Sequence, residues 1–72
     1  MKNFNEIVFE VTQEDDGRFV AECLNEDIFT QAVSWRELRQ NVKEAVFAFY
    51  FDRKGPSSIR LHLFRDELLV LK

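Results

Sequence analysis

The sequence predicts an α+β fold in which three strands are followed by a helix and a fourth strand. The chain has 72 residues, of which 46% are hydrophobic and 32% charged, the composition of one globular domain. Apolar and polar residues alternate in its first third, an Asp-Gly pair separates two of the alternating runs, and a single stretch with helical spacing comes later. We therefore expect residues 1–72 to form one β-β-β-α-β domain.

The first strand is expected over residues 6–11, where every second residue is apolar: Ile7, Phe9 and Val11. The pair Asp16-Gly17 then predicts a hairpin turn, because glycine accepts the positive φ that tight turns require. A second strand should begin at Arg18, with Cys23 on its buried face. Residues 28–33 are rich in β-branched and aromatic side chains and predict a third strand, which completes an antiparallel meander.

A helix is expected to begin after Ser34. In this capping box the Ser34 hydroxyl accepts from the Glu37 N–H, and the Glu37 carboxylate accepts from the Ser34 N–H. Apolar residues then recur every three or four positions, at Trp35, Leu38, Val42, Ala45, Val46 and Phe49. The helix should end near Asp52, before the helix-breaking pair Gly55-Pro56.

Alternation returns after residue 58 and predicts a fourth strand, with Ile59, Leu61 and Leu63 on one face. The helix occupies the position of a crossover, and such connections are right-handed and return a parallel strand to the same sheet. We expect the fourth strand to lie parallel to the first, in the order 3-2-1-4. The single helix can cover one face of this sheet.

Four aromatic residues exceed what one helix packed on a sheet can bury: Phe47, Tyr50, Phe51 and Phe64. Phe47 and Phe51 fall about 180° and 220° around the helix from Leu38. A chain this short buries about 60% of the surface that its unfolded form exposes, so association is a natural supplement to its core. We predict a homodimer, or a dimer of dimers, that buries Phe51 and at least one of Phe47 and Phe64 across a two-fold interface.

Charge and composition argue against several functions. A net charge of -3 and a pI near 5.0 disfavour direct binding of nucleic acid. One histidine, His62, and one cysteine, Cys23, predict no metal site, and Gly17 and Gly55 are too few for a phosphate-binding loop, so no cofactor is expected. We expect no leader peptide and no membrane span, and the single cysteine suits the reducing cytoplasm.

Several stretches of the chain together resemble the HicB-like antitoxin domain family, in its short stand-alone branch: residues 17–23, 28–32, 34–38 and 41–46. The resemblance implies a degraded ribonuclease H-like fold without the nuclease's carboxylates. It also implies a domain that binds and masks the small HicA toxin, an mRNA-cleaving ribonuclease. Asn25-Glu26-Asp27 replaces the family's usual Pro-Gly-Cys corner, and the DNA-binding segment that full-length members append is not expected here.

The leading functional hypothesis is thus a non-catalytic protein-interaction module whose partner is a small basic HicA-like toxin. One alternative is a metal-dependent nuclease of ribonuclease H type, for which the nearest carboxylates are Glu10, Glu44 and Asp66. That alternative requires the three side chains to converge on a shared pair of metal ions. A further alternative is a stand-alone oligomeric regulator with no toxin partner.

Overall fold

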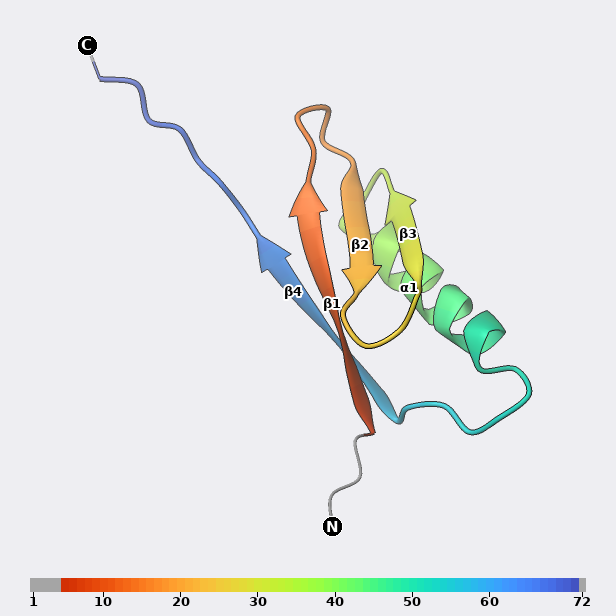
Figure 1. Ribbon diagram of the computed structural model, residues 1–72. Helices are drawn as coiled ribbons and strands as arrows, with labels where there is room; N and C mark the ends of the chain where they lie inside the picture. Colours follow the sequence, from red (N-terminus) through yellow and green to blue (C-terminus); the bar gives the residue numbers. More distant parts are fainter. Residues whose placement is uncertain (1–4, 72) are drawn as a thin grey trace.

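The computed structural model describes residues 5–71 and has the predicted architecture (Figure 1). Its elements, in chain order, are β1 (Glu6–Gln13), β2 (Phe19–Cys23), β3 (Phe29–Ala32), α1 (Trp35–Phe49) and β4 (Ser58–Phe64). The strands form one sheet in the order β3-β2-β1-β4. β1 is antiparallel to β2 and parallel to β4, and β2 is antiparallel to β3. The predicted fold class and strand order are therefore confirmed.

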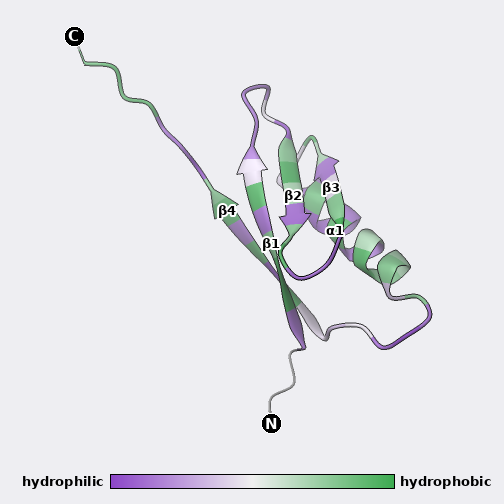
Figure 2. Ribbon diagram, viewed as in Figure 1, coloured by the Kyte–Doolittle hydropathy of each residue, from purple (hydrophilic) through white to green (hydrophobic). Residues whose placement is uncertain are grey.

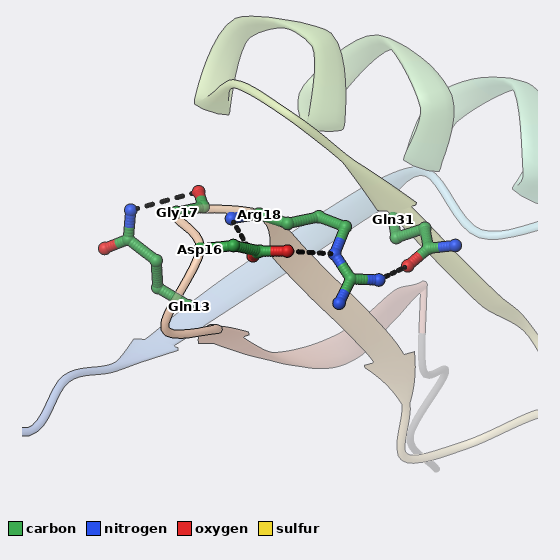
Figure 3. Close-up of polar contacts among 5 residues, drawn as sticks. All are labelled: Gln13, Asp16, Gly17, Arg18 and Gln31. Carbon is green, nitrogen blue, oxygen red and sulfur yellow. Dashed lines mark hydrogen bonds and ion pairs between the residues drawn. The ribbon is translucent and has the colours of Figure 1, made fainter.

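The hairpin between β1 and β2 forms at the predicted glycine. Gly17 has a φ of 92°, and its N–H donates to the Glu14 carbonyl oxygen at 2.8 Å. Arg18 secures this end of the sheet, because its backbone N–H donates to the Asp16 carboxylate at 3.0 Å and its guanidinium to the Gln31 side chain at 2.6 Å (Figure 3). The turn is thereby tied to β3 as well as to β2.

The core lies between α1 and one face of the sheet. Alternate residues of the strands point into it, and so do three helix residues spaced by four and one residue just before β3: Ile7, Phe9, Val11, Ala21, Cys23, Ala32, Leu38, Val42, Val46 and Ile28. The predicted burial of Cys23 is confirmed. The rings of Phe19 and Trp35 meet edge to face, with centroids 5.5 Å apart, and join β2 to the start of α1.

Both ends of α1 differ in detail from the sequence-based expectation. The Ser34 hydroxyl accepts from the Glu37 N–H at 3.1 Å as predicted, but the Glu37 carboxylate accepts from the Val33 N–H, at 3.4 Å, instead of from Ser34. The helix ends at Phe49, and not near Asp52. A turn follows instead, in which the Arg53 N–H donates to the Tyr50 carbonyl oxygen at 3.1 Å.

The side of the sheet formed by β4 is less well covered than the rest. The helix packs against β3 and β2, and β4 lies at the far edge, where Ile59, Leu61 and Leu63 are half-buried (Figure 1). Beyond β4 the chain continues away from the body as an extended segment, and its last residues are hydrophobic (Figure 2). Within residues 5–71, α1 is too short and too polar to cross a membrane.

Candidate interaction surfaces

The sheet face that α1 does not cover carries two acidic residues side by side. The register of β1 and β2 places Glu10 directly opposite Glu22, and both side chains are exposed. The neighbouring strands extend the same row, with Phe29 of β3 beside Glu22 and His62 of β4 beside Glu10. Because side chains alternate along a strand, these four residues share the open face.

The charges of Glu10 and Glu22 are not compensated within the described part of the chain. The ion pairs found there join Arg18 to Asp16 and Arg60 to Glu6, and no cation lies within 4.0 Å of Glu10 or Glu22. Like charges directly opposite one another destabilise a pair of strands. The fold therefore tolerates an unfavourable local arrangement at the centre of an exposed surface.

Large apolar side chains surround these carboxylates. Phe29 is 60% exposed, Leu24 is 59% exposed and Phe64 is 45% exposed. Together with Glu10 and Glu22 they form what we call the acidic sheet face. Apolar surface and unpaired charge of one sign thus occur together on this face.

One end of the same sheet face is closed by an ion pair. The Arg60 guanidinium donates two hydrogen bonds to the Glu6 carboxylate, at 2.6 and 3.1 Å. These hydrogen bonds, together with the positive charge of Arg60, hold the pKa of Glu6 below its ordinary value, and Glu6 in turn raises the pKa of Arg60. Arg60 is thus engaged in joining β4 to β1 and leaves Glu10 unpaired.

A second apolar region is the groove between α1 and the start of β4. The groove has a volume of about 370 Å³, and six apolar side chains contribute to its lining: Val42, Val46, Phe47, Pro56, Ile59 and Leu61. The groove exists because α1 packs over β3 and β2 and does not extend sideways over β4. The groove therefore leaves the helix-side face of β4 open to a further element.

Three of the four aromatic residues predicted to be in excess are exposed. Phe47 is 75% exposed on α1, and Phe51 is 83% exposed in the turn after the helix, so Phe51 lies beyond α1 and not on its flank. Phe64 ends β4 on the open sheet face, where its ring lies 4.5 Å from that of His62. The burial of these residues between subunits stays a prediction.

Tyr50 differs from the other three because it is half-buried against the core of its own chain. Its hydroxyl donates to the Glu26 carboxylate at 2.8 Å, and the Arg53 guanidinium lies over its ring. Gly55 packs so closely on the ring that a Cβ there would lie 3.1 Å from Tyr50 atoms. Partial burial and the bond to Glu26 both raise the pKa of the phenol.

The turn formed by Asn25, Glu26 and Asp27 has a structural role. The Asn25 side chain accepts from the Val8 N–H of β1 at 2.9 Å, and Glu26 holds Tyr50 at the end of α1. Two side chains of this turn thus link it to β1 and to the end of α1.

The carboxylates named for the nuclease alternative do not converge. Glu10 lies on the open sheet face, Glu44 is exposed on α1 across the sheet, and Asp66 lies in the extended segment after β4. No group of three or more His, Cys, Asp or Glu side chains within residues 5–71 could hold a metal ion. The geometry that this alternative requires is not found there.

Sequence reasoning missed the pairing of Glu10 with Glu22, although a signal for it was available. The length of the loop in the β1–β2 hairpin determines which residues of the two strands lie opposite each other, and for this loop Glu10 lies opposite Glu22. It also missed the exposure of Phe29, because a short apolar run does not reveal which of its members face solvent.

Comparison with known proteins identifies the family. A UPF0150 protein from Thermotoga maritima is 32% identical over 71 residues, which cover 99% of this chain and 100% of the relative. No profile of a known protein family matches the chain, and no solved structure gives a significant match. Because the similarity spans both proteins from end to end, the chain belongs to the UPF0150 family.

Proposed function

We propose that this protein is a non-catalytic interaction module that binds a small basic protein through its acidic sheet face. The observation that carries the proposal is the uncompensated pair of Glu10 and Glu22 at the centre of that face. The motif resemblance to HicB-like antitoxins supplies the class of partner, a small basic HicA-like toxin that the module would mask.

A basic partner would convert the unfavourable arrangement into a favourable one. Cationic side chains placed between Glu10 and Glu22 would relieve their mutual repulsion, and complementary charge would accelerate the encounter. The exposed Leu24, Phe29 and Phe64 would supply apolar contact around the charged centre. The net charge of -3 also favours a basic partner.

The compartment proposed for this interaction is the cytoplasm. Cys23 is a free, buried thiol, which fits a reducing environment. A ribonuclease that cleaves mRNA would act in the same compartment.

The proposal is tested by co-expression with the product of the adjacent reading frame, followed by affinity capture. We expect a small basic protein to be captured by the wild-type chain and to be lost with Glu10→Lys. Asp15→Lys is the matched control, because it makes the same charge change in the exposed hairpin turn, away from the sheet face. Capture should survive in that control.

Glu10→Lys also separates lost binding from lost folding. A lysine at this position would face Glu22 and form a favourable cross-strand pair, so the variant should unfold at the same temperature as wild type or slightly higher. Lower affinity in a chain of unchanged or higher stability supports the proposal. Equal capture by wild type, Glu10→Lys and Asp15→Lys, or no basic partner at all, would overturn it in favour of a stand-alone oligomeric regulator.

A further inference from the structure

We propose that two copies of this chain pair along β4, and that residues 65–71 of each copy lie over the groove between α1 and β4 of the other. This inference does not depend on the proposed function, because it uses the opposite face and the far edge of the sheet. The second copy would fill the groove and also shield the hydrophobic end of the chain.

Residues 68–71, in the extended segment after β4, are apolar and exposed to solvent. Four consecutive residues, Leu68, Leu69, Val70 and Leu71, are between 74% and 92% exposed. They follow β4 in an extended conformation and project away from the body (Figures 1 and 2). A contiguous apolar segment of this kind marks a contact with another surface.

The edge of β4 provides the place for that contact. β4 is an outer strand of the sheet, and within residues 5–71 no strand lies beside the hydrogen-bonding groups of its outer edge. Antiparallel pairing across a two-fold axis would join this edge to the same edge of a second copy. The two sheets would then continue into each other.

Such pairing carries the end of each chain to the groove of the other. The groove flanks the start of β4, at Pro56 and Ile59. The extended segment begins after the other end of β4, at Phe64. Antiparallel strands place the end of one beside the start of the other. Residues 65–71 would therefore run past the start of the partner's β4, and at roughly 3.3 Å per residue they span about 23 Å.

Charge and side-chain direction agree with this placement. Arg39 and Lys43 border the groove, and neither has an acidic partner within 4.0 Å in the described part of the chain. If the alternation of β4 continues, Glu67, Leu69 and Leu71 point to the same side as Leu63, toward the helix layer. An acidic residue followed by leucines would thus meet a groove that has a basic border and an apolar floor.

Folding back onto the same chain is disfavoured by the residues between β4 and the apolar end. A return along β4 needs a tight turn, and such turns depend on glycine or asparagine at positions with positive φ. The intervening residues are Arg65-Asp66-Glu67, and all non-glycine residues described have negative φ. The extended direction of the segment therefore favours a second copy as the occupant.

Sedimentation equilibrium of the full chain tests the pairing. We expect a dimer at micromolar concentration and a rise of about tenfold or more in its dissociation constant for Leu69→Glu, because an acidic side chain would enter an apolar groove. Val33→Glu is the matched control, since Val33 is also a highly exposed aliphatic residue but lies between β3 and α1. Its dissociation constant should equal that of the wild type.

A charge exchange tests the contact itself. Lys43→Glu and Glu67→Arg should each weaken the dimer, and the two together should restore it, because the attraction is rebuilt with the signs reversed. None of these positions lies on the acidic sheet face, so partner capture can be measured separately. A wild-type chain that stays monomeric at millimolar concentration, or Leu69→Glu and Val33→Glu with the same dissociation constant, would overturn the inference.

Cross-linking distinguishes a second copy from the same chain. In a Cys23→Ala background, chains carrying Ser57→Cys are mixed with chains carrying Leu69→Cys and then oxidised. We expect disulfide-linked dimers that contain one chain of each kind. If mixed dimers are absent, and the variant with both cysteines closes a disulfide within one monomer, the segment folds onto its own groove and the proposal is wrong.

Discussion

On the helix-side face of the sheet, the side under α1 and the side at the β4 edge differ in how completely their residues are buried. Where α1 packs, Phe9, Val11 and Ala21 have no exposed surface. At the β4 edge, Leu61 on the same helix-side face is only half-buried, and the apolar residues after β4 are largely exposed. The region under α1 thus has the packing of a stable core, and the β4 edge leaves apolar side chains exposed to solvent.

The dimensions of the elements explain this difference. Four strands place the outer two about 14 Å apart, whereas a helix with its side chains is about 10 Å wide. The single helix packs against β3 and β2, so it cannot also cover β4. Within residues 5–71 no element covers the helix-side face of β4 as α1 covers that of β2 and β3, so substitutions in the two regions should have different consequences.

The largest expected effect is on the covered side. Phe9→Ala should lower the free energy of unfolding by about 3 to 5 kcal/mol, because it leaves a cavity at the centre of the core. Phe47→Ala should change the stability of the monomer by no more than about 0.5 kcal/mol, because its ring is largely in solvent. Urea denaturation at low protein concentration measures both. Equal losses in the two variants would mean that the two sides are not different.

The covered side is also the part that the sequence predicts best. Strand alternation, the Asp-Gly turn and the Ser34 cap are local signals, and each was confirmed, as was the parallel placement of β4. The end of α1 was predicted three residues too late, near Asp52. The bond from Tyr50 to Glu26 joins residues 24 positions apart, and no local pattern could reveal it.

The candidate surfaces were predicted less completely, for a related reason. Helical geometry was enough to place Phe47 outside the core, and strand alternation placed Phe64 on the open face. The acidic sheet face depends on which residues of neighbouring strands lie opposite one another, and this register is set by the length of the loop between them. The groove depends on the lateral position of the helix, which the sequence does not encode locally.

The next largest effect is expected for Phe51, in the turn after α1. Phe51→Glu should raise the dissociation constant of the homo-oligomer by about tenfold or more, because a fully buried phenylalanine is worth roughly 1.5 to 3 kcal/mol. Far-UV circular dichroism should be unchanged, since Phe51 lies in a turn and is exposed in the monomer. If sedimentation shows no change, Phe51 lies outside the interface and the sequence-based prediction for it is wrong.

A smaller effect is expected for Tyr50, at the end of α1. Tyr50→Phe removes the hydrogen bond to Glu26 and should cost about 1 kcal/mol of stability. The pKa of the Tyr50 phenol is raised in the folded chain. The stabilisation that the protonated phenol gives the folded chain is therefore complete below the ordinary pKa of about 10, and it is lost as pH rises through the pKa of the folded chain. Tyr50 is the single tyrosine, so its ultraviolet absorbance gives the titration directly. A midpoint at or below the ordinary value would contradict this reasoning.

The smallest effect is expected for the ion pair that joins β4 to β1. The Arg60 guanidinium lowers the pKa of Glu6 in the folded chain, so the stabilisation is present above the ordinary glutamate pKa and is lost as pH falls through the folded value. Both side chains are exposed to solvent, and salt should weaken their attraction. Glu6→Gln should therefore flatten the acid side of the stability profile slightly at low ionic strength and have no effect at high ionic strength. Glu10→Gln is the matched control, because it removes a carboxylate from the same strand that has no cation beside it. In this variant the Glu6–Arg60 pair is intact, so stability should still fall at acid pH as the pair is lost. The comparison separates the ion pair from a general effect of negative charge on β1.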